Sequence, residues 1–114
     1  MARDTDNQRE YFRLSYPLRL MPTIHIDGVE HRISEISEGG LRFQVQNLAA
    51  FPIGGEVCGI ITFGDGARTP ISAVTLRWDK LEVILAPLEG VSFKRIVTEQ
   101  RSLIRECPLL KFNF

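Results

Sequence analysis

Two short groups of residues near the beginning of this chain offer chemistry that suits a ligand. Arg9 and Arg13 lie four positions apart, and Glu35, Ser37 and Gly40 follow just over twenty positions later. A guanidinium group matches phosphate oxygens or the O6/N7 edge of guanine, and a carboxylate accepts hydrogen bonds from guanine N–H donors. Each group supplies what the other lacks, so together they predict a local site for an anionic guanine nucleotide.

The second group lies where the sequence pattern predicts a β-hairpin and a following turn. Asp27-Gly28 separates the strand-like runs 23–26 and 29–36. Asp-Gly is a strong hairpin signal because both positions tolerate positive φ. Glu35 and Ser37 are two positions apart, so an extended backbone places both side chains on one face. A side chain at position 40 could block a ligand or forbid the dihedral angles of the turn, which would explain Gly40. The alternative is a turn glycine with no ligand.

The two groups resemble the signature of the PilZ domain family of cyclic di-GMP receptors. That signature reads R-x-x-x-R in an N-terminal segment and D/N-x-S-x-x-G at a strand-to-strand turn. Arg9 and Arg13 match the first part, and Ser37 and Gly40 match the second. Glu35 departs from the pattern, since it stands where the family has Asp or Asn.

The resemblance extends along most of the chain. Residues 74–78 and 90–93 are similar to the family's V-x-W-like and G-V-x-F-like strands, so the likeness spans roughly residues 9 to 106. The R-x-x-x-R spacing alone is weak, because it recurs at Arg101 and Arg105, where a solvated helix face explains it. Specificity comes from the order and spacing of both motifs.

The resemblance implies a cyclic di-GMP receptor that signals to an unidentified protein effector, in a process such as motility or biofilm regulation. Arg9 and Arg13 would contact phosphates and guanine edges. Glu35 would accept from guanine N1–H and N2–H₂. Ser37 would hydrogen-bond to the base or a phosphate, and Gly40 would permit close approach. Binding is expected to order the N-terminal arm over the ligand.

Two further positions leave alternatives open. Trp78 is a weaker ligand candidate that could stack on a guanine, but a core or barrel-rim aromatic is the favoured interpretation. Gln8 stands where the family often has another arginine, so the sequence does not decide between one bound nucleotide and two.

Other functional classes compete with the receptor. A PilZ-like adaptor that binds a protein but no nucleotide is motivated by Glu35 and by the apolar tail 109–114, which either packs back on the domain or forms a partner surface. An enzyme is disfavoured, since Ser37 lacks a G-x-S-x-G elbow and an activating His and acid. No cofactor is expected.

Composition sets limits on the partners. The 114 residues carry 14 basic and 14 acidic side chains, so no global field attracts DNA, RNA or an anionic membrane. No run approaches the roughly 18 apolar residues that span a bilayer, and the polar start is unlike a signal peptide. We therefore expect a cytoplasmic protein, as a monomer or weak homodimer.

The expected fold is all-β. With 44% hydrophobic residues the chain can bury one core. Strand-like runs at 18–21, 23–26, 29–36, 41–45, 56–63, 69–78, 81–85 and 91–93 predict an antiparallel barrel of six or seven strands. A short C-terminal helix is expected over 98–106, capped at Thr98. Residues 1–15 would be a flexible arm and 16–114 the barrel with its helix and tail.

The cysteines and histidines do not suggest a metal site. Cys58 and Cys107 are expected to be free thiols that are buried or half-buried, and their spacing is unlike a disulfide scaffold. His25 and His31 flank the Asp27-Gly28 turn without forming a recognisable ligand cluster with either cysteine. Zinc is therefore not expected.

Overall fold

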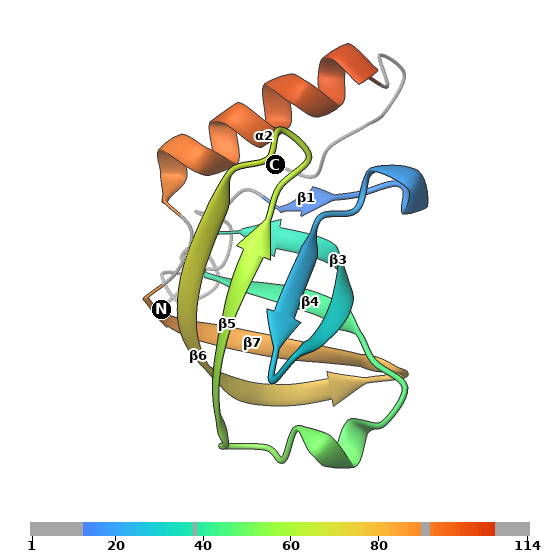
Figure 1. Ribbon diagram of the computed structural model, residues 1–114, viewed down its shortest axis with the longest axis vertical. Helices are drawn as coiled ribbons and strands as arrows, with labels where there is room; N and C mark the ends of the chain where they lie inside the picture. Colours follow the sequence, from blue (N-terminus) through green and yellow to red (C-terminus); the bar gives the residue numbers. More distant parts are fainter. Residues whose placement is uncertain (1–12, 38, 90–91, 107–114) are drawn as a thin grey trace, which may run out of the picture.

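The protein is a closed antiparallel barrel with one helix across one end (Figure 1). The structure is a computed structural model, and it describes residues 13–37, 39–89 and 92–106. Predictions made above for Arg9, Cys107 and the tail 109–114 fall on residues outside the described ranges.

Seven strands form one sheet within the described part of the chain. They are β1 (Leu14–Ser15), β2 (Thr23–Ile26), β3 (Val29–Ser37), β4 (Gly40–Gln44), β5 (Glu56–Thr62), β6 (Arg68–Asp79) and β7 (Glu82–Glu89). Two 3₁₀ turns, η1 (Leu18–Leu20) and η2 (Leu48–Ala50), and the helix α2 (Phe93–Glu106) complete the described elements.

The barrel closes because β3 pairs with strands on both of its sides. The order in the sheet is β1-β3-β2-β5-β6-β7-β4, and an additional β3–β4 pairing joins its ends. Six strands therefore form the closed barrel and β1 adds to the outside of β3. The prediction of an all-β barrel of six or seven strands with one C-terminal helix is confirmed.

Local sequence explains the hairpins that build this barrel. Asp27 and Gly28 have φ of 51° and 80°, so the Asp-Gly pair adopts the positive dihedrals that a tight hairpin between β2 and β3 needs. In β4, Leu41 and Phe43 point into the core while Arg42 and Gln44 alternate outward. This alternation gives the barrel one apolar inner face and one polar outer face.

Helix α2 is attached to the barrel end by apolar and polar contacts. Ile96 and Leu103 are almost fully buried and belong to the same core cluster as the inner face of the barrel. Glu99 is 6% exposed, and its Oε1 accepts a hydrogen bond of 2.8 Å from the hydroxyl of Tyr16. Burial and the adjacent Glu99 raise the pKa of Tyr16 far above its usual value, so the phenol keeps its proton and remains a donor.

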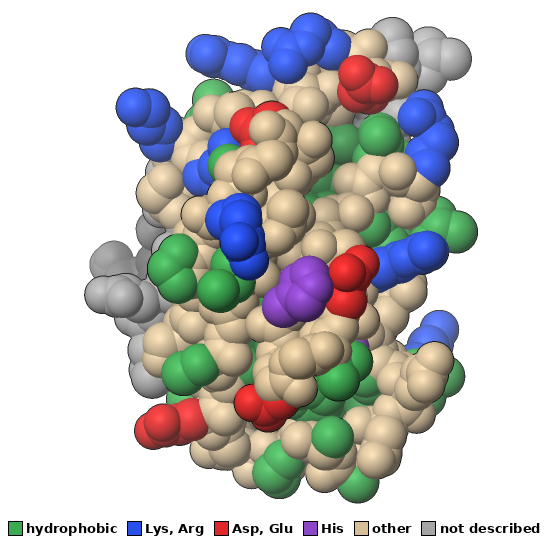
Figure 2. All heavy atoms as spheres, viewed as in Figure 1, with side chains coloured by type: hydrophobic (Ala, Val, Ile, Leu, Met, Phe, Trp, Pro, Cys, Tyr) green, Lys and Arg blue, Asp and Glu red, His purple; other side chains and the backbone are tan. Residues whose placement is uncertain are grey.

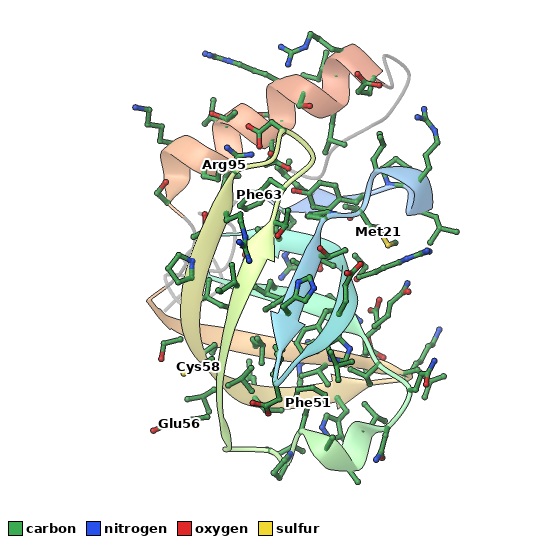
Figure 3. The ribbon with its side chains drawn as sticks, viewed as in Figure 1. Met21, Phe51, Glu56, Cys58, Phe63 and Arg95 are labelled. Carbon is green, nitrogen blue, oxygen red and sulfur yellow. The ribbon has the colours of Figure 1, made fainter. Side chains whose placement is uncertain are left out.

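An arginine extends this attachment to the turn between β5 and β6 (Figure 3). Arg95 Nη2 donates to Glu99 Oε2 at 2.7 Å and to Asp65 Oδ1 at 2.8 Å. Its guanidinium carbon lies 4.1 Å from the ring centroid of Phe63. Since Glu99 accepts from two donors, the hydroxyl of Tyr16 and the cation Arg95, its burial is compensated.

Some predicted elements were wrong. Leu18–Leu20 form a 3₁₀ turn rather than a strand, because the amide of Leu20 bonds to the carbonyl of Pro17 at 2.9 Å. The strand expected over 81–85 continues past Pro87 to Glu89, with Pro87 opposite Ala73 beside an irregularity in the ladder.

The start of the helix and the environment of Cys58 also differ from expectation. Helix α2 begins at Phe93, not Thr98, and Ser92 Oγ accepts from the amide of Arg95 at 3.1 Å as its cap. Thr98 instead bonds to the carbonyl of Lys94 inside the helix. Cys58 is exposed rather than buried, because it lies on the outer face of β5.

Candidate functional site

Four of the residues singled out from the sequence line one pocket. Arg13, Glu35, Ser37 and Gly40 surround a cavity of about 180 Å³ where the beginning of β1 meets the turn between β3 and β4. A site for a whole drug-sized ligand typically measures roughly 300–1,000 Å³. The pocket formed by the described residues is therefore smaller than a whole site of that kind.

Strand register explains why these residues meet. Leu14 lies opposite Ile36 and Ser15 opposite Glu35, so the antiparallel pairing of β1 with β3 brings Arg13 alongside Ser37. Residues 14 and 15, assigned above to the arm, pair with β3, and Leu14 is completely buried. The arm is thereby attached to the strand that carries the second motif. The division of the chain at residue 15 stays a prediction.

Ser37 shapes the turn that follows β3. Its hydroxyl donates to the carbonyl of Gly40 at 3.3 Å and accepts from the amide of Gly39 at 3.2 Å. Ser37 is half-buried, so the hydroxyl remains at the pocket wall rather than in the core. The serine can therefore organise the turn as well as face a ligand.

Gly40 is required by the neighbouring strand. A Cβ added at Gly40 would lie 2.6 Å from the carbonyl oxygen of Leu85 in β7, which no real Cβ tolerates. Its φ is outside the left-handed region, so the expectation that a turn dihedral demands glycine here was wrong. Close approach of β4 to β7 explains this glycine without reference to a ligand.

Glu35 faces an arginine that the sequence reasoning missed. Arg42 lies directly opposite Glu35 in the β3–β4 pairing. Its Nη2 donates to Asp79 Oδ2, and its Nε donates to Glu82 Oε1 at 3.0 Å. Partial burial opposes the charged form of Arg42, but the hydrogen bond to Asp79 and the adjacent carboxylates, Glu35 included, raise its pKa overall. Arg42 is thus a positioned cation beside Glu35.

Residues of β6 and β7 in the pocket were also missed. Leu76 and Arg77 of β6 line it together with Ile84 of β7. No local signal in the sequence pairs them with Glu35, because their position depends on the register of β4, β7 and β6.

Trp78, the weaker candidate, is not among the residues that line this pocket. It is 39% exposed, and its Nε1 donates to the carbonyl of Phe51 at 2.8 Å. This hydrogen bond ties β6 to the segment after η2 and fits the barrel-rim alternative better than stacking on a guanine.

A larger cavity of about 580 Å³ lies beside the β2–β3 turn and η2. Its lining includes His31 and Phe51, whose ring centroids lie 5.5 Å apart in an edge-to-face contact. Burial lowers the pKa of His31 below its usual value. None of the residues of the two sequence motifs that are described lines this cavity.

Charge is mixed over the face seen in Figure 2, where Lys and Arg side chains gather over α2 and acidic groups are spread among the rest. Within the described ranges, no three His, Cys, Asp or Glu side chains are grouped as a metal site would require. No helix in the described part of the chain is long and apolar enough to cross a bilayer.

Comparison with known proteins gives one family and a set of similar folds. The family model described as PilZ domain matches residues 7–107. A search of curated proteins finds no match. A crystal structure of an uncharacterized Legionella protein is similar with a TM-score of 0.60 and 17% identity, over 83% of this chain and 96% of that one.

The structure of the Bacillus subtilis inhibitor of motility, MotI/DgrA, is similar with a TM-score of 0.66 and 18% identity. The match covers 90% of this chain and 53% of that protein, so the present chain spans about half its length. At these identities the two likenesses show the barrel fold.

Proposed function

This chain belongs to the PilZ domain family, and from that premise we propose that it is a cyclic di-GMP receptor that passes the signal to a protein effector. PilZ domains are receptor or adaptor domains rather than enzymes. The observation that carries the proposal is the meeting of Arg13 with Glu35, Ser37 and Gly40 around one pocket.

The charges at the pocket suit a doubly anionic ligand. Arg13 is exposed and makes no hydrogen bond or ion pair with another described residue, so its guanidinium is available to a phosphate or to a guanine edge. Arg42 holds a positive charge opposite Glu35 and is itself held by Asp79 and Glu82. Glu35 can therefore accept hydrogen bonds from guanine N–H groups, while the positive charge of Arg42 offsets its negative charge.

The small size of the pocket supports ordering of the arm on binding. A cavity of about 180 Å³ accommodates part of a dinucleotide, and Arg9 lies in the segment directly before the described residues. In this proposal the arm closes over the ligand and Arg9 joins Arg13 on its phosphates and guanine edges. The ordered arm then presents a changed surface to the effector.

Calorimetric titration of the purified protein with cyclic di-GMP tests the proposal, with GTP and cyclic di-AMP as ligand controls. Losing one charge-assisted hydrogen bond of about 1.5–3 kcal/mol corresponds to roughly tenfold to hundredfold in affinity. We expect that loss in Arg9→Ala and in Arg13→Ala, whereas Arg32→Ala, an exposed arginine of β3 that does not line this pocket, should bind like wild type. Equal binding by all three variants would contradict the assignment.

A second candidate function is a PilZ-like adaptor that binds a protein and no nucleotide. Two observations favour it: Glu35 replaces the family's Asp or Asn, and the hydroxyl of Ser37 is already satisfied within its own turn. An absence of heat with cyclic di-GMP from a folded protein would support this adaptor function.

The cellular setting remains part of the proposal. The fold likeness to an inhibitor of motility favours a role in motility control. We propose a cytoplasmic location and a monomer or weak homodimer, which sedimentation of the free and nucleotide-bound protein would test.

A further inference from the structure

Strand β6 contains an irregularity at the pocket that changes which side chains face outward. Thr75 lies opposite Leu85 and Arg77 lies opposite Ile84, so Leu76 is an extra residue in β6 without its own partner in β7. This is the arrangement of a β-bulge, which re-aims the side chains that follow it.

The bulge directs two consecutive side chains, Leu76 and Arg77, to the outer face, and the following Trp78, opposite Val83, is 39% exposed. Thr75 is 1% exposed and points inward, and Leu76 is 55% exposed. In a regular strand the next residue would point inward again. Because of the extra residue, Arg77 is exposed as well, and both Leu76 and Arg77 line the pocket.

Register places Arg77 in one row with the motif residues. Glu35 pairs with Arg42, Arg42 pairs with Ile84, and Ile84 pairs with Arg77, so the row crosses four adjacent strands on the outer face. Directly opposite residues in a sheet share a face and lie within side-chain reach. Ile84 is only 9% exposed and separates the two arginines as an apolar floor.

The two arginines of this row differ in what they already bind. Arg42 is held by hydrogen bonds to Asp79 and Glu82. Arg77 makes no hydrogen bond or ion pair within the described ranges, although its charge contributes to lowering the pKa of Asp79. Arg77 is therefore the cation on this wall whose donors remain available.

We propose that the bulge at Leu76 and Arg77 forms the second wall of the nucleotide site, where Arg77 donates to a phosphate or a guanine edge and Leu76 packs against a purine face. This inference rests on the proposed function and adds to it a recognition element outside both sequence motifs. An apolar platform beside a free guanidinium suits a ligand that is both aromatic and anionic.

The test is titration with cyclic di-GMP of two pairs of variants. Arg77→Ala should weaken binding by about tenfold or more, since it removes a charge-assisted contact. Its matched control is Arg68→Ala, an exposed arginine of the same strand outside the pocket, which should bind like wild type. Arg77→Lys should fall between wild type and Arg77→Ala, because lysine keeps the charge but loses the planar fork.

The apolar half of the wall is tested in the same way. Leu76→Ala should weaken binding by about threefold or more, because it removes part of a buried apolar contact. Leu81→Ala, at a leucine that is 63% exposed in the β6–β7 turn, is its control. Thermal melts of all four alanine variants should match wild type, which would show that any loss of binding is local.

The possible outcomes separate this inference from the proposed function. If wild type binds and both Arg77→Ala and Leu76→Ala bind equally well, the second wall is refuted while the receptor function stands. If wild type gives no heat, the receptor function and the wall both fail. Weaker binding by the pocket variants with unchanged controls supports the wall.

Discussion

Replacing Gly40 by alanine separates a structural requirement from a ligand requirement. The added Cβ would lie 2.6 Å from the carbonyl oxygen of Leu85, about 0.8 Å short of the 3.4 Å at which ordinary contact begins. The opposing atom belongs to the backbone of β7, so no side chain can rotate away. Strands β4 and β7 must separate at a point where Leu41 pairs with Leu85.

The cost of this overpacking is about 1–3 kcal/mol. For a domain of this size we expect the Tm of Gly40→Ala to fall by roughly 5–12 °C, which a thermal melt of the ligand-free protein measures. The matched control is Gly64→Ala, since nothing lies within 4 Å of a Cβ at Gly64 and its φ is outside the left-handed region. That variant should have an unchanged or slightly raised Tm.

An unchanged Tm in Gly40→Ala would refute this reasoning. If that variant also lost affinity for cyclic di-GMP, the glycine would instead be needed for close approach of the ligand. A lowered Tm would show that the motif glycine is required by the barrel even without ligand.

Three further predictions concern stability. Tyr16→Phe removes the donor to buried Glu99 and should lower the free energy of unfolding by about 1.5–3 kcal/mol in urea denaturation; no change would mean that the bond contributes nothing net. Because burial lowers the pKa of His31 below 6.5, the unfolded chain takes up a proton more readily, so stability should fall as the pH drops through 6.5, and His31→Gln should flatten that slope. The hydrogen bond from Arg42 lowers the pKa of Asp79, so the ionised Asp79 should stabilise the fold above about pH 4. This stabilisation should be lost as the pH falls through the lowered pKa of Asp79. The stability of Asp79→Asn should therefore depend less on acid pH than that of wild type, and equal acid profiles would contradict this.

Local patterns predicted the hairpins well because their causes are local. The Asp27-Gly28 turn follows from two residues that accept positive φ, and the alternation in 41–45 follows from one buried face. The helix start was missed because Phe93, read as the end of a strand, has a side-chain type common in strands, while its cap is supplied by Ser92. Whether Phe93 ends a strand or begins a helix depends on the tertiary packing that buries Ile96.

The site was predictable only in part, for a similar reason. Glu35 and Ser37 could be placed on one face from their spacing, and both line the pocket. Arg42, Leu76 and Arg77 could not be found, because they reach the pocket through pairing across β4, β7 and β6 and through a bulge that leaves no clear sequence signal.

The most direct test of the account is to map the bound nucleotide by amide chemical-shift changes in isotope-labelled protein titrated with cyclic di-GMP. We predict that the saturable changes centre on Arg13, Glu35, Ser37 and Arg77. Changes centred instead on the larger cavity around His31, with the amides of the smaller pocket unmoved, would contradict it.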